Sequence, residues 1–547
     1  NHKKIMGNQC VILTCEGSVT DPNMTKVEHY YGIEFTRGES NQGGNNGYHK
    51  MIGDATLLKE MRFHNQMAIV NVKDAAITAE LNQTNWNKTK DGGTSVLDGS
   101  DGSDIMQVHK KSVYAIIGGS NATYERYIVS DHPFSYDGDE AIEFPAGGDT
   151  PDYAVLLDGM MRSIRNDKVD GTHFAGNGTA HTDSDYGTAD AKGYPKTQLT
   201  RFQFEQYARA KNSDPSSNLP YTNICNFDLE LEMAFMFIEF RTKNLNSLLG
   251  HGISSIAAPT ADTWGKVTGF RLTNDGGNTY TYLTFGSNVY LPGSQTPTNM
   301  FTVLNQSSPV LKVFEGQLAV SNGQTLEPVK DADGNAVQGM SNGVMTGVWT
   351  KRFSFQLNAS LTQGGEAKTY NVDAVLSVPI WRGKVRLWGN CSQWISGYEL
   401  LHYLLGDTYH YKVYRAPSVA ALTTDADVTY KTAEGGFAFE KSYEYVGEMP
   451  ATKTAGGVGF GWAKKMLSLR NITTAIMAEG GGNIGTFENA TSYGFNSATA
   501  GQYIRRGSLF GGNAYGSLCV LRYAAVNVEP SPSDAYLGSG FRVQLDD

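Results

Sequence analysis

The stretch NFDLELEMAFMFIEF, residues 226–240, constrains the fold most strongly, because apolar side chains cover most of the circumference of the helix it predicts. Asn226 is the predicted N-cap, Asp228 favours the positive end of the helix dipole, and Arg241 and Lys243 favour the negative end. No apolar run in the chain approaches the roughly 18 residues that suggest a membrane span. We therefore expect a core helix that other elements enclose, and we predict no membrane insertion.

The rest of the chain predicts an α+β, β-rich fold. It has 62 glycines against 17 prolines, together with 29 tyrosines, which is typical of turn-rich β structure. Residues 1–145 read as strands joined by polar turns, residues 200–212 predict a second helix, and β patterns return over 260–375. A chain of 547 residues also exceeds what one compact core supports, so we expect two to four domains.

Composition and motifs argue against most catalytic and nucleic-acid functions. The formal charge of −10 disfavours binding to nucleic acid, because affinity for phosphate backbones depends on clustered Lys and Arg. We find no GxSxG, HExxH or Walker motif and no close Cys–His arrangement, and we predict no catalytic residue, metal or cofactor. The five cysteines are widely scattered, which favours buried free thiols: Cys10, Cys15, Cys225, Cys391 and Cys519.

Three segments carry a family resemblance. The stretch RRGSLFGGNAYGSLCVLRYAAVNVEPSPSDAYLGSGFR, residues 505–542, contains R-G-S, G-G-x-A-x-G and a G-F-R ending. The stretch WRGKVRLWGNCSQWISGYEL, residues 381–400, contains R-G-x-x-x-x-W-G-N-x-x-x-W, and residues 230–254 combine a predicted helix with an N-S-x-x-G-x-G turn. Together they resemble the variable proteins that diversity-generating retroelements mutate. The family's ending lacks Ser539, which is an insertion here.

The resemblance implies a C-type-lectin-like fold, which formylglycine-generating enzymes share. We expect an N-terminal β-rich attachment or oligomerisation domain over 1–145, followed by the first part of the lectin-like domain over 146–259. A β-rich insertion would occupy 260–375, and the lectin-like core would resume over 376–547 with its variable region at 505–542.

The resemblance also implies a function that involves no catalysis. Family members display a diversified surface; at the tails of phages of gut bacteria they bind a receptor on the host cell, which is a protein or a glycan. We expect a hypervariable receptor-binding protein in the virion that docks to other tail subunits through residues 1–145. We also expect a homotrimer or larger array, because a higher copy number strengthens weak single-site binding. The alternative is an adhesin at the bacterial cell surface or pilus tip. A formylglycine-generating activity needs paired copper-binding cysteines, whereas Cys391 and Cys519 stand alone in separate motifs.

The candidate binding residues lie in the variable region. Mutagenesis in this family reaches Tyr, Ser, Asp, Arg, Ala, Val, Leu and Phe but excludes Lys, Trp, Met and Gln, and residues 507–542 contain none of the excluded four. Tyr, Ser, Asn and Arg are also typical of binding surfaces, although the tyrosines could equally be ordinary strand residues. No calcium is predicted, because Glu529-Pro530 is followed by serine. The predicted receptor-binding residues are Phe510, Asn513, Tyr515, Ser517, Arg522, Tyr523, Val526, Val528, Asp534 and Tyr536.

Overall fold

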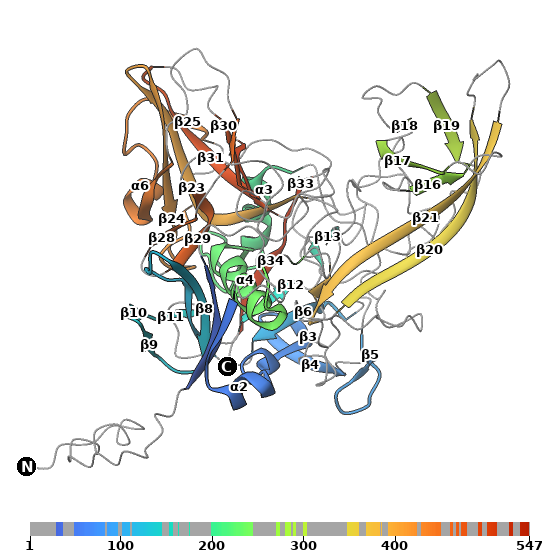
Figure 1. Cartoon of the computed structure of the whole chain (residues 1–547), viewed down its shortest axis with the longest axis horizontal. Helices are drawn as coiled ribbons and strands as arrows, with labels where there is room; N and C mark the ends of the chain where they lie inside the picture. The colour runs from blue at the N-terminus through green and yellow to red at the C-terminus, as the bar shows by residue number, and fades with distance from the viewer. Residues whose placement is uncertain are drawn as a thin grey trace, which may run out of the picture.

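The structure is a computed structural model in which a buried helix lies between three sheets, while a further set of strands leads away from them (Figure 1). The described residues are 29–36, 49–82, 85–96, 101–109, 112–144, 153–156, 162–163, 174–175, 199–243, 245, 270–273, 279–285, 288–290, 299–303, 347–359, 368–382, 384–385, 392–423, 428–449, 460–462, 466–469, 472–478, 491–494, 500–510, 524–528 and 537–545.

The central helix α4 spans Asn226–Phe240, and every one of its residues is buried. It packs against strands of both halves of the chain, and Figure 1 shows it in green between the blue strands and the orange strands. The prediction of a core helix is confirmed. Among the described residues, no helix is long and apolar enough to cross a membrane.

The predicted N-cap was wrong by one residue. Cys225 caps the helix, and the Asp228 carboxylate accepts its backbone N–H at 2.9 Å. Asn226 instead turns its amide toward Gly397, where an added Cβ would lie 2.0 Å from Asn226 Oδ1. Gly397 also has a φ of +89°, a conformation that favours glycine. Position 397 therefore requires glycine both for its backbone conformation and for the close approach of Asn226.

The first sheet combines strands from both ends of the chain. Its order is β2-β1-β8-β7-β29-β28, with β11 beside β7, and all neighbours are antiparallel except β29 and β7. The strands are β1 (Tyr30–Thr36), β2 (His49–Gly53), β7 (Val113–Gly118), β8 (Tyr124–Ser130), β11 (Ile142–Phe144), β28 (Met466–Leu469) and β29 (Ile472–Ala478).

The second sheet is antiparallel and brings the C-terminal strand into the N-terminal half. Its order is β15-β34-β12-β6-β3-β4-β5. The strands are β3 (Met67–Lys73), β4 (Ala76–Asn82), β5 (Asn85–Thr89), β6 (Asp104–His109), β12 (Tyr153–Leu156), β15 (Tyr221–Asn223) and β34 (Phe541–Gln544).

The third sheet contains most of the strands of residues 505–542, the region that the sequence predicts to be variable. Its order is β26-β24-β23-β31-β32-β30-β27, with β25 beside β31 and β33 beside β23. The strands are β23 (Ser392–Leu405), β24 (Thr408–Arg415), β25 (Tyr430–Lys431), β26 (Glu444–Met449), β27 (Phe460–Trp462), β30 (Thr491–Gly494), β31 (Tyr503–Phe510), β32 (Ala524–Val528) and β33 (Leu537–Gly538).

A further set of strands, from residue 270 onward, forms a ring of its own; the β-rich insertion over 260–375 stays a prediction. Consecutive strands pair from β16 to β21, and β16 also pairs with β21, so the ring closes. Figure 1 shows β20 and β21 as a long ribbon that leads away from the helices. The strands are β16 (Phe270–Thr273), β17 (Thr279–Phe285), β18 (Asn288–Tyr290), β19 (Asn299–Val303), β20 (Gly347–Ala359), β21 (Lys368–Trp381) and β22 (Lys384–Val385).

The other elements are short helices and two-residue strands. The predicted helix near residue 200 is confirmed as α3, capped by Thr200, whose hydroxyl accepts the Gln203 N–H at 3.1 Å. These elements are α2 (Ala55–Glu60), the 3-10 helix η3 (His64–Gln66), α3 (Arg201–Arg209), α6 (Phe439–Ser442), β9 (Ser135–Tyr136), β10 (Asp139–Glu140), β13 (Arg162–Ser163) and β14 (Phe174–Ala175).

The domain boundary expected at residue 145 does not separate two cores. One hydrophobic cluster includes Tyr31 and Tyr127 from the N-terminal strands, Phe237 from α4, and Leu400 and Tyr411 from β23 and β24. The reason lies in α4, because a helix that is apolar on most sides needs packing partners all round.

Buried ion pairs tie α4 to its surroundings. The helix carries four carboxylates, all at least nine-tenths buried, and each pairs with a cation from another part of the chain. Because an unpaired buried charge is costly, each pair fixes one neighbouring segment against the helix. The pairs are Asp228 with Arg542 (3.0 Å), Glu230 with Arg415 (2.7 Å), Glu232 with Lys384 (2.7 Å) and Glu239 with Arg382 (2.9 Å).

The substitution Arg415→Met tests this role. It leaves the Glu230 carboxylate buried without its cation, and we expect the free energy of unfolding to fall by about 3–5 kcal/mol. Urea unfolding monitored by circular dichroism measures the change. The control is Lys90→Met, which breaks an exposed pair with Glu80 and should cost at most about 1 kcal/mol. Equal losses in the two variants would contradict the role assigned to the buried pairs.

Candidate functional site

The first of two segments that are predicted to vary, residues 511–523, begins and ends on paired strands. Strand β31 ends at Phe510 and β32 begins at Ala524, and these two residues are direct cross-strand partners. Residues 511–523, which join them, lie outside the described residues. Their two ends are thus held side by side in the third sheet.

The second variable segment is held in the same way. Strand β32 ends at Val528, which pairs with Gly507 of β31, and β33 begins at Leu537, which pairs with Ser392 of β23. Residues 529–536 lie outside the described residues. Strands β23, β31, β32 and β33 therefore hold all the ends of both segments.

One predicted binding residue was wrong. Phe510 has 2% of its surface exposed, lies in the main hydrophobic core and faces Tyr398 with ring centroids 6.1 Å apart. A ring buried in this way cannot contact a receptor, and it anchors the end of β31 instead.

For the other predicted binding residues, the structure gives no side-chain contact or exposure, and they remain predictions. Val526 and Val528 belong to β32, at the point where its pairing with β31 shifts register, and only their backbone is described. The remaining seven lie outside the described residues: Asn513, Tyr515, Ser517, Arg522, Tyr523, Asp534 and Tyr536.

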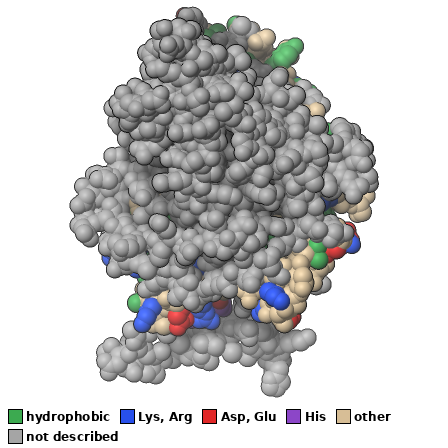
Figure 2. Space-filling model, turned by 90° about the vertical axis from the view of Figure 1, so that its right-hand side faces the viewer, with side chains coloured by type: hydrophobic (Ala, Val, Ile, Leu, Met, Phe, Trp, Pro, Cys, Tyr) green, Lys and Arg blue, Asp and Glu red, His purple; other side chains and the backbone are tan. Residues whose placement is uncertain are grey.

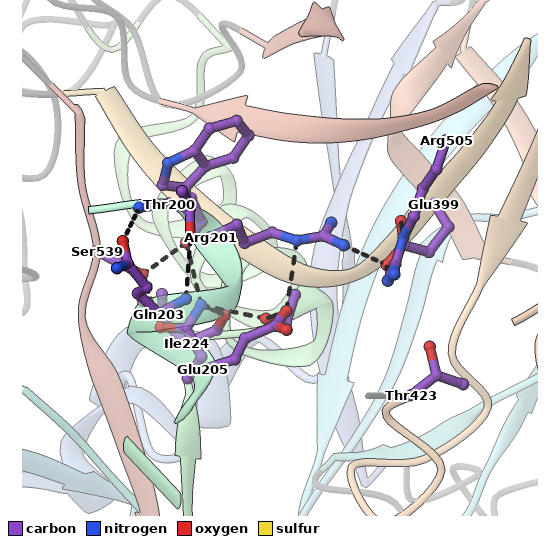
Figure 3. A network of polar contacts seen from close by, with 12 residues as sticks. Thr200, Arg201, Gln203, Glu205, Ile224, Glu399, Thr423, Arg505 and Ser539 are labelled. Carbon is purple, nitrogen blue, oxygen red and sulfur yellow. Dashed lines mark hydrogen bonds and ion pairs between the residues drawn. The ribbon is translucent and has the colours of Figure 1, made fainter. Parts of the chain in front are cut away.

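A buried polar network lies beneath these strands (Figure 3). At one end, the Glu399 carboxylate accepts from Arg201 Nη2 at 2.6 Å and from Arg505 Nε at 2.8 Å. All three side chains are at most 2% exposed. Burial alone would raise the pKa of Glu399, but the charges and hydrogen bonds of Arg201 and Arg505 hold that pKa below its usual value.

The network continues from Arg201 to the other side of the variable region. Arg201 Nε lies 3.4 Å from Glu205, which accepts from the Ser396 hydroxyl at 2.6 Å. Asn223 Nδ2 donates to that hydroxyl oxygen at 3.1 Å, and Ser539 Oγ donates to Asn223 Oδ1 at 2.8 Å. Polar contacts therefore connect Arg505, which precedes both variable segments, with Ser539, which follows them.

Ser539 has a structural explanation. Its side chain is 0% exposed, and besides Asn223 its hydroxyl oxygen lies 2.8 Å from the carbonyl oxygen of Trp394. The inserted residue thus closes the network against β23. Three residues later, Arg542 of the G-F-R ending pairs with Asp228 at the start of α4.

Gly507 is a point of close approach in this region. A Cβ at this position would lie 2.9 Å from Cζ3 of the buried Trp394 ring and 3.5 Å from Arg201 Nη1. The glycine of the R-G-S motif therefore lets β31 approach Trp394 and Arg201 closely. We call Arg201, Asn223, Trp394, Glu399, Arg505, Gly507 and Ser539 the frame.

The frame is built for support rather than for chemistry on a substrate. Its described side chains are buried, and its charges are paired with one another. The described residues contain no group of three His, Cys, Asp or Glu that could hold a metal ion. The described thiol, Cys225, is buried, and burial raises its pKa well above the usual value. This arrangement can hold strands in register, and any binding would fall to the segments between them.

Sequence reasoning missed Arg201, Asn223 and Glu399. A usable signal was present for Glu399, because a carboxylate within the apolar run GYELLHYLL indicates a buried ion pair. Its partners lie 198 and 106 residues away, and no local pattern identifies contacts over such separations.

Among known proteins, no family model matches the chain and no curated protein matches its sequence.

Charged side chains of both signs lie on part of the surface. Figure 2 shows, low on the face that it views, described Lys and Arg side chains interspersed with Asp and Glu. Mixed signs of this kind produce no single-sign field that would steer a charged ligand to that part of the surface.

The variant Gly507→Ala tests the close approach to Trp394. The added methyl group overlaps the indole ring, and we expect the free energy of unfolding to fall by about 1–3 kcal/mol. Chemical denaturation measures it in the wild-type background and in Trp394→Phe, whose smaller ring lacks the indole Cζ3. The penalty should shrink in the Trp394→Phe background, whereas an equal penalty in both backgrounds would show that Trp394 is not its cause.

Proposed function

We propose that the chain is a ligand-binding protein that displays a diversified surface, drawn from residues 505–542, on a C-type-lectin-like domain. The observation that carries this proposal is the placement of the frame, which joins the residues that flank both variable segments. A binding surface that tolerates many sequences needs ends that do not move when its side chains change. The residue types of the region suit such a surface, with tyrosines as rigid anchors and Ser, Asn and Arg as adaptable hydrogen-bonding groups.

The first candidate role is host attachment by a phage tail. In this role the ligand is a protein or glycan on the bacterial surface, and the chain acts in the virion as a homotrimer or larger array. The N-terminal residues would contact other tail subunits. Since Tyr31, Val113 and Tyr127 share a hydrophobic cluster with α4, this attachment surface would be rigidly connected to the display surface.

The second candidate is an adhesin on the bacterial surface that uses the same display. The family resemblance supports the two roles equally. They differ in genetic context, because tail proteins are encoded beside other phage structural genes and adhesins beside secretion or pilus genes.

Deep sequencing of the gene's 3′ end across the source population tests the diversification. We expect variation at the codons of Asn513, Tyr515 and Tyr523, beside a near-copy template and a reverse transcriptase gene. The codons of Glu399 and Ser539 should stay fixed, because their side chains are buried in the frame. Invariant codons throughout 511–536, with no template nearby, would contradict the proposal.

A binding measurement tests the surface itself. Labelled full-length protein is titrated onto host cells, and the triple variant Tyr515→Ala, Tyr523→Ala and Tyr536→Ala should bind at least about 30-fold more weakly, as expected when anchor residues are lost. The matched control is Tyr430→Ala, which removes a tyrosine that is 56% exposed on β25, outside the variable region. Equal binding by the triple variant and the wild type would place the binding surface elsewhere.

A further inference from the structure

A buried histidine lies where the N-terminal strands meet α4. His64 of η3 has no exposed surface, and its Nε2 donates to the carbonyl oxygen of Phe235 in α4 at 2.8 Å. On the other side, the Tyr31 hydroxyl oxygen accepts the backbone N–H groups of Phe63 and His64 at 3.0 and 3.3 Å. The hydroxyl hydrogen of Tyr31 is therefore directed to His64 Nδ1 at 2.7 Å, and the ring is held neutral.

A positive charge already occupies the space beside this ring. Arg382 Nη1 donates to the backbone carbonyl oxygen of His64 at 3.1 Å and to Asn65 Oδ1 at 3.0 Å. The Glu239 carboxylate balances Arg382 with contacts of 2.9 Å and also accepts from Trp381 Nε1 at 2.8 Å. Burial, followed by the charge of Arg382, holds the pKa of His64 well below its usual value.

A second histidine faces the same place from β6. The ring of Phe235 contacts both histidines, with centroids 4.4 Å from His64 and 5.4 Å from His109. Burial, His64, Arg382 and Lys384 lower the pKa of His109 to about 3. Lys384 is in turn paired with Glu232 of α4 at 2.7 Å. The carboxylates on this side of α4 thus already have cationic partners.

We propose that this contact is an acid-sensitive junction, in which protonation of His64 and His109 separates β1, η3 and β6 from α4 and Arg382. A proton on His64 Nδ1 displaces the hydrogen donated by Tyr31 and places a second positive charge beside Arg382. A proton on His109 adds a third charge near Lys384. This inference concerns the joint between the two halves and is independent of the proposed binding function.

The sign of the pH dependence follows from the two states. In the open form both histidines regain an ordinary pKa near 6.5, so below about pH 6.5 the open form takes up protons that the closed form excludes. The ratio of closed to open molecules therefore falls by up to about tenfold per pH unit for each histidine, and by up to about 100-fold for both. Above about pH 6.5 the junction keeps its full stability, and the loss continues until pH approaches the lowered pKa values.

Hydrogen exchange read by mass spectrometry on the full chain tests the junction. With rates corrected for intrinsic exchange, we expect the protection of β1, β6 and α4 to fall by roughly 10- to 100-fold between pH 6.5 and 5.5. In the double variant His64→Gln and His109→Gln the same peptides should change little, because glutamine does not titrate and its amide can still donate to Phe235. The control His132→Gln replaces a histidine that is 66% exposed and should behave as the wild type.

Two outcomes would overturn the proposal. One is unchanged protection of β1 and β6 in the wild type between these pH values. The other is an equal loss of protection in the double variant, which would assign the acid response to other titratable groups. One such group is His402 in the third sheet, because burial and then the charge of Arg506 lower its pKa to about 3. If the double variant fails to fold, His64→Gln alone should show about tenfold less loss per pH unit than the wild type.

Discussion

The whole arrangement depends on one interaction, the pairing of the four buried carboxylates of α4 with cations from distant segments. An apolar helix can be enclosed in many ways, because hydrophobic contacts are not directional. Ion pairs in a buried setting are directional, and a mismatched neighbour leaves a charge unpaired at a cost of about 3–5 kcal/mol. The pairs with Arg382, Arg415 and Arg542 therefore select one arrangement of the strands around the helix.

The same logic extends from the helix to the display surface. Arg542 connects the start of α4 to the strand that follows the variable region, and Ser539 connects that strand to the polar network of the frame. At the other side, Glu399 holds Arg505 at the beginning of β31. A chain of buried contacts thus runs from the core to both flanks of the variable region. Under the proposed function, these contacts would let the surface change its side chains while the strands that carry it keep their positions.

The sequence predicted the elements better than their assembly. The buried helix and α3 followed from apolar periodicity and capping, and the β-rich character of the chain followed from alternating strands and turns. The N-cap prediction failed because Cys225 occupies the cap position, with its N–H donated to Asp228, while the Asn226 side chain lies against Gly397, far away in the chain. The contacts that cross the expected boundary at residue 145 could not be predicted, because strand pairing between β7 and β29 or between β6 and β12 has no local signal. Phe510 was misplaced for a similar reason, since its burial depends on Tyr398 in another strand.

The most direct test of the account is to determine structures of two natural variants that differ only within residues 511–536 and bind different host strains. We predict that the contacts of Glu399 with Arg201 and Arg505, and of Ser539 with Asn223, superimpose within about 0.5 Å, the tolerance expected of a preorganised site. Rearranged frame contacts in one variant would show that diversification alters the fold itself, and the frame would lose the role assigned to it.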